Sequence, residues 1–262
     1  MILLINIIVG FFGLMIGSFL NMLTIRLANE ESLRTQRSYC PHCRHTLAAK
    51  DLIPVLSFLS LRGRCRYCRA PISWQYPLVE LATALLFVLV FMKFTPTLII
   101  NESWGLSTLS FIRDFIFTAG LIALFVLDWR WYIVPDEVSI PLIIFAFAAN
   151  IFLGMPLISL LWGMAIGGGL YFLLWSVSRG RWVGSGDIRL GLLLGAMLGA
   201  KGTLTALFAA YIIGGIVAAI LLATGLKKFG SKLPMGTFLT IGAFVALVYG
   251  NFLEQWFIIV GF

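Results

Sequence analysis

Apolar stretches long enough to cross a lipid bilayer recur along most of the chain, and short polar segments separate them. An α-helix rises about 1.5 Å per residue, so roughly 20 apolar residues cover a hydrocarbon layer of ~30 Å. The pattern predicts an all-α polytopic membrane protein with about eight transmembrane helices, at residues 2–23, 76–94, 109–127, 138–153, 157–177, 188–200, 203–223 and 235–260. The fourth and sixth of these stretches are shorter than the others, which predicts a tilted, broken or incompletely spanning helix there.

One polar segment, residues 26–75, departs from this pattern. It lies between the first two predicted helices and contains nine of the basic residues, both histidines and all four cysteines. Such a composition does not belong inside a bilayer, so it predicts a small domain inserted between the two helices. We therefore expect three parts: a first transmembrane helix in residues 1–25, the inserted domain in 26–75 and a transmembrane domain in 76–262.

Composition and charge fix the class of protein and its orientation. Sixty per cent of the residues are apolar and 11% are charged, which excludes a water-soluble domain of this length. With the N-terminus outside, sixteen of the 19 basic residues fall on the cytoplasmic side, leaving Lys93, Arg113 and Lys201 outside. This asymmetry follows the positive-inside rule and places residues 26–75, 128–137, 178–189 and 225–234 in the cytoplasm. Topology thus accounts for the net charge of +8, and no interleaving of aromatic and basic residues indicates nucleic acid as a partner.

The four cysteines form two Cys-x-x-Cys pairs, Cys40 with Cys43 and Cys65 with Cys68, separated by 21 residues. This spacing is close to that of zinc ribbons, in which four thiolates give Zn²⁺ a closed tetrahedral shell with a structural role. The alternatives are two disulfides or a redox dithiol, and a cytoplasmic location disfavours stable disulfides. His42 and His45 flank Cys43 and could replace a ligand, but with four cysteines available they are expected to face solvent or to lie beside the ligands. A segment of about 50 residues is near the lower size limit for a stable core, so a metal would have a clear structural purpose.

Two acidic residues are placed at the cytoplasmic ends of predicted helices. Asp128 ends the third helix, and Asp187 follows Gly184-Ser185-Gly186 at the start of the sixth. The predicted topology brings both to the same face, where two carboxylates sharing a site of low dielectric would supply one acid and one base. Such a pair can hydrolyse a peptide bond without a metal, and the glycines before Asp187 would let an extended substrate backbone approach.

Other acidic residues have plainer interpretations. A single aspartate at a helix end is most often a cap or a side chain that reaches water, and Asp136, after Pro135, is interpreted as a cap of the fourth helix. Glu80, inside the second helix, is expected to pair with an arginine or to line a polar groove. Both histidines lie in the cysteine segment, so the helical domain contains no His-Glu-x-x-His zinc site and no Ser–His pair.

Several glycines are clustered in two predicted helices. In transmembrane bundles, small residues let helix backbones approach each other closely. We therefore expect close helix–helix contacts at these positions, which are Gly163, Gly167, Gly168 and Gly169 in one helix and Gly191 and Gly195 in another.

Motifs along nearly the whole chain resemble those of the type IV prepilin peptidases, a family of membrane aspartyl proteases with a Gly-x-Gly-Asp motif. They occur in the order that the family shows. They are Gly-Ser-Phe-Leu-Asn at 17–21 with Arg26, the two cysteine pairs, residues 51–57 and 61–65, Tyr-Pro-Leu-Val-Glu at 76–80, the segment from Asp128 to Asp136, and Gly-Ser-Gly-Asp-Ile-Arg-Leu at 184–190.

The resemblance implies a bacterial inner-membrane protease in which Asp128 and Asp187 are catalytic. It also implies a substrate: the short basic leader of prepilins or pseudopilins of type IV pili and type II secretion, cut after a glycine on the cytoplasmic face. For members with the cysteine domain it implies methylation of the new N-terminal amine with S-adenosylmethionine. Neither spacing nor composition indicates this second activity, and no residue is assigned to that cofactor.

Two rival functions stay open on the sequence. Paired membrane carboxylates also serve ion-coupled transporters, which would place them near the middle of the membrane in both halves of an inverted repeat. The protein could also be a non-enzymatic zinc-domain scaffold of a secretion assembly, in which case Asp128 and Asp187 would be replaceable. The ordered motifs favour the protease.

Overall fold

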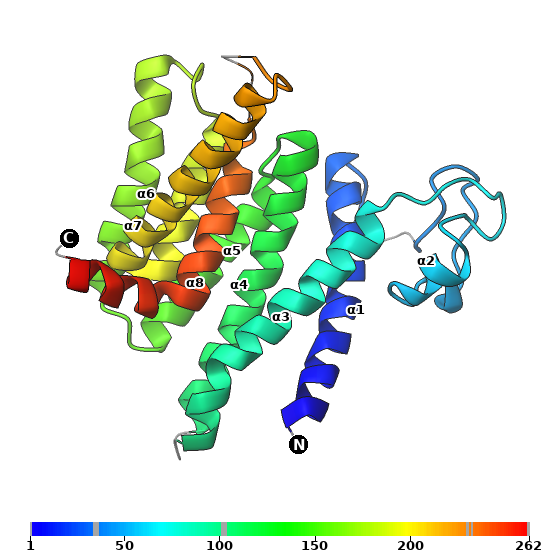
Figure 1. Cartoon of the computed structure of the whole chain (residues 1–262), viewed down its shortest axis with the longest axis horizontal. Coiled ribbons are helices and arrows are strands. Elements are labelled where there is room, and N and C mark those ends of the chain that lie inside the picture. Colours follow the sequence, from blue (N-terminus) through cyan, green and yellow to red (C-terminus); the bar gives the residue numbers. More distant parts are fainter. Residues whose placement is uncertain (1, 34–36, 101–103, 229–230, 232, 261–262) are drawn as a thin grey trace. The chain divides into compact units, whose positions relative to one another are not determined.

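The computed structural model of the chain describes residues 2–33, 37–100, 104–228, 231 and 233–260. Arg34 and Lys232, two of the basic residues used for the topology, lie outside these residues. The described chain is helical almost throughout, with two isolated β-bridges, so the all-α prediction is confirmed (Figure 1). The long helices are α1 (Ile2–Ala28), α3 (Gln75–Ile100), α4 (Trp104–Trp131), α5 (Asp136–Phe152), α6 (Leu157–Ser178), α7 (Ser185–Ala223) and α8 (Met235–Val260).

The helices agree with the predicted transmembrane segments. Among the residues that the structure describes, five helices are long and apolar enough to cross a membrane, namely α1, α3, α4, α6 and α7, and α8 is apolar over Met235–Gly250. Helix α5, the predicted short fourth segment, has 17 residues. The predicted sixth and seventh segments form the single 39-residue element α7, which is broken at Gly199. This break falls next to the boundary expected from the sequence.

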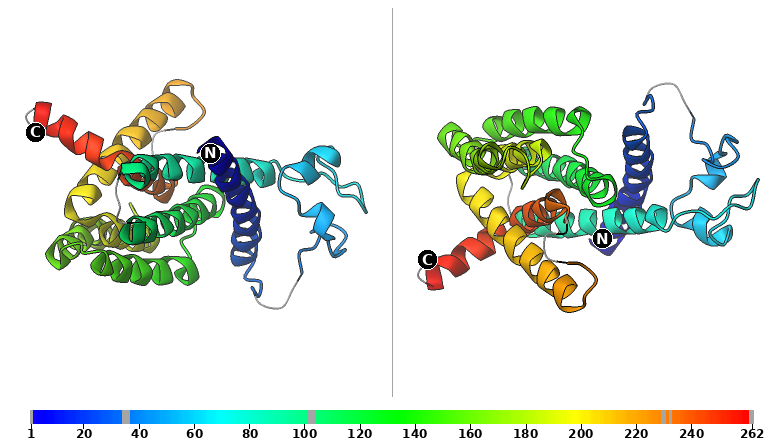
Figure 2. Two further views of the ribbon diagram at one scale, coloured as in Figure 1. Left: turned by 90° about the horizontal axis from the view of Figure 1, so that it is seen from below. Right: turned by 90° about the horizontal axis from the view of Figure 1, so that it is seen from above.

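The chain forms two compact units, Met1–Trp104 and Gly105–Phe262. In the first unit α1 packs along α3. A Cβ atom on Gly17 would lie 2.7 Å from Cα of Glu80, so the two helix backbones approach closely there. Between these helices the chain forms the 3-10 turn η1 (Ala49–Asp51), the short helix α2 (Leu56–Ser60) and the cysteine-bearing turns. In all views this segment projects from the α1–α3 pair (Figure 2).

The second unit is a helical bundle with a continuous apolar core. Helices α5, α6 and α8 each pack against α7. The burial of apolar side chains and close backbone packing fix how these helices lie against each other. The core draws on every helix from α4 to α8, through residues that include Phe117, Leu124, Leu142, Tyr171, Leu190, Leu193, Leu194 and Leu239.

Glycines let α6 and α7 approach each other, as the sequence predicts. A Cβ atom on Gly167 would overlap the backbone of Gly191, and one on Gly195 would overlap the backbone of Met164. Gly163 and Gly168 also face α7 closely. The prediction is wrong for Gly169, where an added Cβ would meet nothing within 4 Å.

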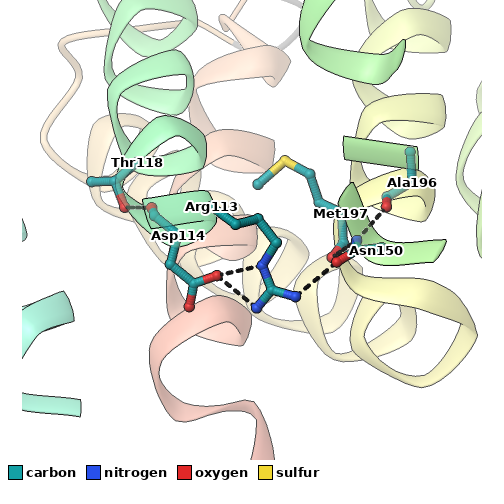
Figure 3. Close-up of polar contacts among 6 residues, drawn as sticks. All are labelled: Arg113, Asp114, Thr118, Asn150, Ala196 and Met197. Carbon is teal, nitrogen blue, oxygen red and sulfur yellow. Dashed lines mark hydrogen bonds and ion pairs between the residues drawn. The ribbon is translucent and has the colours of Figure 1, made fainter. Parts of the chain in front are cut away.

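Polar side chains from neighbouring helices form hydrogen bonds with backbone groups at the break in α7 (Figure 3). Gly199 has a φ of 66°, a conformation that favours glycine, and it interrupts the hydrogen-bond ladder of the helix. Nδ2 of Asn150 donates to the carbonyl oxygens of Ala196 and Met197 at 2.7 and 2.9 Å. Asn150 is held in turn by Arg113, whose guanidinium also pairs with the fully buried Asp114.

The break returns the chain to the end of the bundle where α7 begins. Gly242 of α8 packs against Ala206 and Ala210, and Phe238 packs against Gly214, so α8 runs antiparallel to the second half of α7. The first turn of α8 therefore comes back to the first turn of α7.

Candidate functional site

Asp128 lies in the last turn of α4 and is 6% exposed. Its Oδ2 accepts hydrogen bonds from the backbone N–H of Thr237 at 2.5 Å and from the Thr237 hydroxyl at 3.0 Å. Gly236 lies so close that a Cβ atom there would be 2.8 Å from the Asp128 carboxyl carbon. The first turn of α8 thus encloses this carboxylate.

Asp187 is the third residue of α7 and is 9% exposed. Its Oδ2 accepts a hydrogen bond from the backbone N–H of Gly184 at 3.0 Å, so the side chain caps the amino end of its own helix. Gly184 has an extended backbone conformation and stands at the cap position. The local sequence therefore fixes where the Asp187 carboxylate lies.

The bundle brings the two carboxylates together. Asp128 and Asp187 are close enough to interact electrostatically. Gly236 packs between Asp128 and Leu190, and Leu190 lies one helical turn after Asp187. Two carboxylates at the end of a largely apolar bundle cannot both ionise readily, because like charges repel strongly where the dielectric is low. The juxtaposition expected from the sequence is therefore present.

The role expected of Gly186 is wrong. The sequence suggested that its missing side chain leaves room for a substrate. A Cβ atom on Gly186 would instead lie 2.9 Å from Cβ of Val134, so the space is filled by the α4–α5 loop of the same chain. Gly186 lets this loop pack against the start of α7.

Asp136 is not the cap that the sequence suggested. It is the first residue of α5, follows the cap residue Pro135, and makes no capping hydrogen bond. Its half-exposed carboxylate forms an ion pair with Arg189 of α7 at 2.8 Å. Arg189 also donates to the carbonyl oxygen of Val134. Asp136 therefore helps to fasten the α4–α5 loop to α7.

Glu80 has partners other than those expected. It is 5% exposed and accepts a hydrogen bond from the backbone N–H of Val55 at 2.7 Å and another from the Ser18 hydroxyl. It pairs with no arginine among the described residues. Val55 has a φ of 61°, which is uncommon for a β-branched residue. Glu80 thus ties the loop before α2 to the α1–α3 pair.

The four cysteines form one cluster in the first unit. Their sulfur atoms all lie within 4.8 Å of one another, and none is in a disulfide. Each pair sits in the same kind of turn: the N–H of Cys40 donates to His45, and that of Cys65 donates to Ala70. Arg44 and Arg69, each directly after the second cysteine of its pair, have φ values of 58° and 62°. Neither histidine belongs to the cluster.

This cluster fits a tetrahedral metal ion. Zn–S bonds of about 2.3 Å in a regular tetrahedron separate the sulfurs by about 3.8 Å, and the Cys40–Cys68 sulfur distance is 3.8 Å. The backbone N–H of Cys68 points at the Cys65 sulfur and, against the effect of burial, lowers the pKa of Cys65 to about 7. The N–H of Ala70 acts in the same direction on Cys68, but burial and the neighbouring sulfurs outweigh it and raise the pKa of Cys68 to about 11. A bound cation would offset the electrostatic repulsion between these four thiolates.

Sequence reasoning missed Gly236 and Thr237 because neither side chain is ionisable and both lie far from Asp128 along the chain. The available signal was a Pro-Met-Gly-Thr run at the start of the last apolar stretch, where a helix begins. Only the return of α8 to the end of α4 gives these residues a role.

Two protein-family models match parts of the chain. Residues 11–94 match the Bacterial Peptidase A24 N-terminal domain, and residues 115–219, which include both aspartates, match the Type IV leader peptidase family. The chain is 33% identical to the prepilin leader peptidase/N-methyltransferase of Aeromonas hydrophila over 96% of this chain and 93% of that protein. It is 32% identical to the protein of the same name from Bacillus subtilis over 94% of this chain and 95% of that protein. No solved structure matches the chain.

Proposed function

Because the chain belongs to the type IV leader peptidase family, we propose that it is a membrane aspartyl endopeptidase that removes the leader of type IV prepilins or pseudopilins. The observation that carries the proposal is the pair of buried carboxylates, Asp128 and Asp187, within the residues that match the family. Both belong to the ends of helices, which also disfavours an ion pathway at the middle of the membrane.

The pair is suited to peptide hydrolysis. The ionised carboxylate takes a proton from water as the water attacks the scissile carbonyl carbon, and the protonated carboxylate donates to the carbonyl oxygen. No covalent intermediate is needed. The low dielectric around Asp128 and Asp187 strengthens both interactions because little water competes for them.

The names of the relatives also include N-methyltransferase. We assign this second activity, as methylation of the new N-terminal amine, to the cysteine-bearing domain of residues 26–75. S-adenosylmethionine, when bound, supplies an electrophilic methyl group. The described residues present no set that we assign to this cofactor. Cys40, Cys43, Cys65 and Cys68 hold one structural Zn²⁺, since the donor set and its geometry fit that ion and leave no open coordination position.

The proposed location is the bacterial inner membrane, with the N-terminus outside and the carboxylate pair near the cytoplasmic face. Support comes from the distribution of basic residues and from the five apolar helices found in the described part of the chain. The last turn of α4 carries Arg130, and the α6–α7 loop carries Arg179 and Arg181, on the same predicted side as Asp128 and Asp187.

The test uses the purified full chain in lipid nanodiscs, incubated with a prepilin and separately with a pseudopilin, each with and without S-adenosylmethionine. Mass spectrometry reads the loss of the leader and the gain of a methyl group. Leader loss is expected in both conditions and methylation only with S-adenosylmethionine. Intact substrates would overturn the peptidase assignment, and cleaved but unmethylated products would overturn the second activity alone.

A further inference from the structure

The two carboxylates are held differently. Oδ2 of Asp128 accepts two hydrogen bonds from Thr237, one from the backbone N–H and one from the hydroxyl. Oδ2 of Asp187 accepts one hydrogen bond, from the N–H of Gly184 in the first turn of its own helix. Each carboxylate accepts a hydrogen bond from the first turn of a helix, Asp128 from α8 and Asp187 from α7, which favours the ionised form. Asp128 also lies at the carboxyl end of α4, where the helix dipole acts against a negative charge. The donor that Asp128 has and Asp187 lacks is the hydroxyl of Thr237.

Thr237 is well placed to act on the carboxylate. It is the third residue of α8, where the backbone N–H has no partner within the helix and is free to donate outward. Its side chain is 1% exposed, so little water competes with the hydroxyl for Asp128. Hydrogen bonds to an ionised acceptor are stronger than those to a neutral one, so both donors favour the carboxylate form.

We propose that Thr237 is a positioning residue that keeps Asp128 ionised, so that Asp128 is the base and Asp187 carries the shared proton. This inference rests on the proposed peptidase function and assigns the two roles within it. Both donors occupy Oδ2 of Asp128, which leaves Oδ1 to receive the proton of the attacking water.

The resulting step balances. The water oxygen bonds to the scissile carbonyl carbon while one water proton moves to Asp128 and the proton of Asp187 moves to the carbonyl oxygen, giving a neutral gem-diol. Asp128 then gives its proton to the amide nitrogen and the C–N bond breaks. One hydroxyl of the gem-diol returns a proton to Asp187. The products are a carboxylic acid and an amine, and both aspartates regain their starting states.

The geometry requires glycine before Thr237. A Cβ atom at Gly236 would lie 2.7 Å from Leu190 and 2.8 to 2.9 Å from the Asp128 carboxyl group. Any side chain there would push the first turn of α8 away from α4 and lengthen both hydrogen bonds from Thr237.

The test compares three variants of the full chain in the leader-cleavage assay. Thr237→Val keeps the shape of the side chain and removes the hydroxyl, so kcat should fall about 10- to 100-fold, the effect of losing a hydrogen bond to a charged group, while KM is unchanged. Thr237→Ser should restore kcat to within about threefold of the wild type, because it restores the donor. Thr240→Val is the matched control: its hydroxyl is equally buried on α8 and donates to the Thr237 carbonyl oxygen.

The pH profile distinguishes the two role assignments. Asp187 is the titratable side chain that faces Asp128 from α7, and residues 235–240 at the start of α8 include none. If Asp128 is the base, Thr237→Val moves the acid limb of kcat to higher pH, because the lost donor favoured the ionised form. Movement of the alkaline limb instead would make Asp128 the acid and overturn the assignment.

The inference also fails if Thr237→Val cleaves at the wild-type kcat, or if Thr240→Val loses as much activity as Thr237→Val. Failure of the proposed function looks different, because then the wild type itself leaves every prepilin intact.

Discussion

In the helical unit Gly105–Phe262, α6 and α7 approach until Gly167 and Gly195 have no space for a side chain, and a continuous apolar core joins five helices. The cysteine domain, whose described residues here are 37–75, has by contrast only a small buried core. Its buried residues are Cys40, Pro54, Phe58 and Cys65. Two of these four are sulfur ligands of the predicted metal site. The first region is stabilised by backbone packing, and the second depends on one cluster of thiolates.

The two proposed activities belong to these two different regions. The carboxylate pair lies in the helical bundle, where its geometry depends on packing between helices. The cysteine domain is attached through local contacts such as that of Glu80 with Val55. Changes in the bundle should therefore affect cleavage directly, and changes in the cysteine domain should first affect the folding of that domain.

The largest expected effect is on the carboxylates. Asp128→Asn and Asp187→Asn preserve side-chain size and remove a group able to ionise, so each should abolish leader cleavage, measured by mass spectrometry. The double variant should be no worse than either single one, since the two residues act as one unit. Asp136→Asn is the control and should retain most activity, because it weakens only a half-exposed ion pair with Arg189. Activity in Asp128→Asn with loss in Asp136→Asn would reverse the assignment.

Metal removal should unfold one region and spare the other. We expect one zinc per chain, and its chelation should raise amide hydrogen exchange in residues 37–75 towards that of an unfolded chain, because metal binding supplies much of the folding free energy of so small a domain. Exchange in the helices of Gly105–Phe262 should be unchanged. Cys65→Ser should lose the zinc, whereas His42→Ala should keep it. If the amides of the cysteine domain stayed protected from exchange in a zinc-free chain, the folding of this domain would not depend on the metal.

A substitution in the packed glycines should destabilise the bundle. In Gly195→Ala the new methyl group would overlap the backbone of Met164, so the free energy of unfolding should fall by about 3 kcal/mol or more. Gly169→Ala is the matched control on the other side of α6, where the methyl group meets nothing, and should stabilise the helix by about 0.5–1 kcal/mol. Thermal unfolding in a fixed lipid mixture measures both. Equal stability of the two variants would contradict the role of close backbone packing.

The smallest expected effect lies on the surface of the cysteine domain. Burial acts to raise the pKa of Asp51, but hydrogen bonds from Arg66, the N–H of Ala48 and Tyr67 outweigh it and hold the pKa below its usual 3.8. A lowered folded-state pKa stabilises the domain above pH 3.8, and this contribution is lost as the pH falls through the folded-state value. Since Arg66 is partly exposed, Asp51→Asn should cost at most about 1 kcal/mol at neutral pH.

Hydrogen exchange of residues 37–75 in the zinc-loaded chain measures the effect of Asp51→Asn. The exposed Glu30 provides the control, because Glu30→Gln makes the same change in charge. A larger loss of protection in Glu30→Gln than in Asp51→Asn would show that net charge, and not the contacts of Asp51, decides the stability.

The sequence by itself determined the features that depend on neighbouring residues. Runs of apolar residues specify helices in a membrane whatever they pack against, because the backbone must satisfy its own hydrogen bonds there. The spacing within each cysteine pair shapes its own turn, and Gly184 to Asp187 contains its own helix cap. These local signals predicted the helices, the metal cluster and two acidic residues at helix ends.

The tertiary structure decided which distant groups meet. Thr237 reaches Asp128 across 109 residues because α7 reverses at Gly199, and Asn150 closes that break from another helix. The partners of Asp136, Gly186 and Glu80 likewise come from segments that only folding brings near. The physical reason is that such contacts depend on how whole helices pack, and packing depends on the combined shape of many side chains, which no single motif encodes.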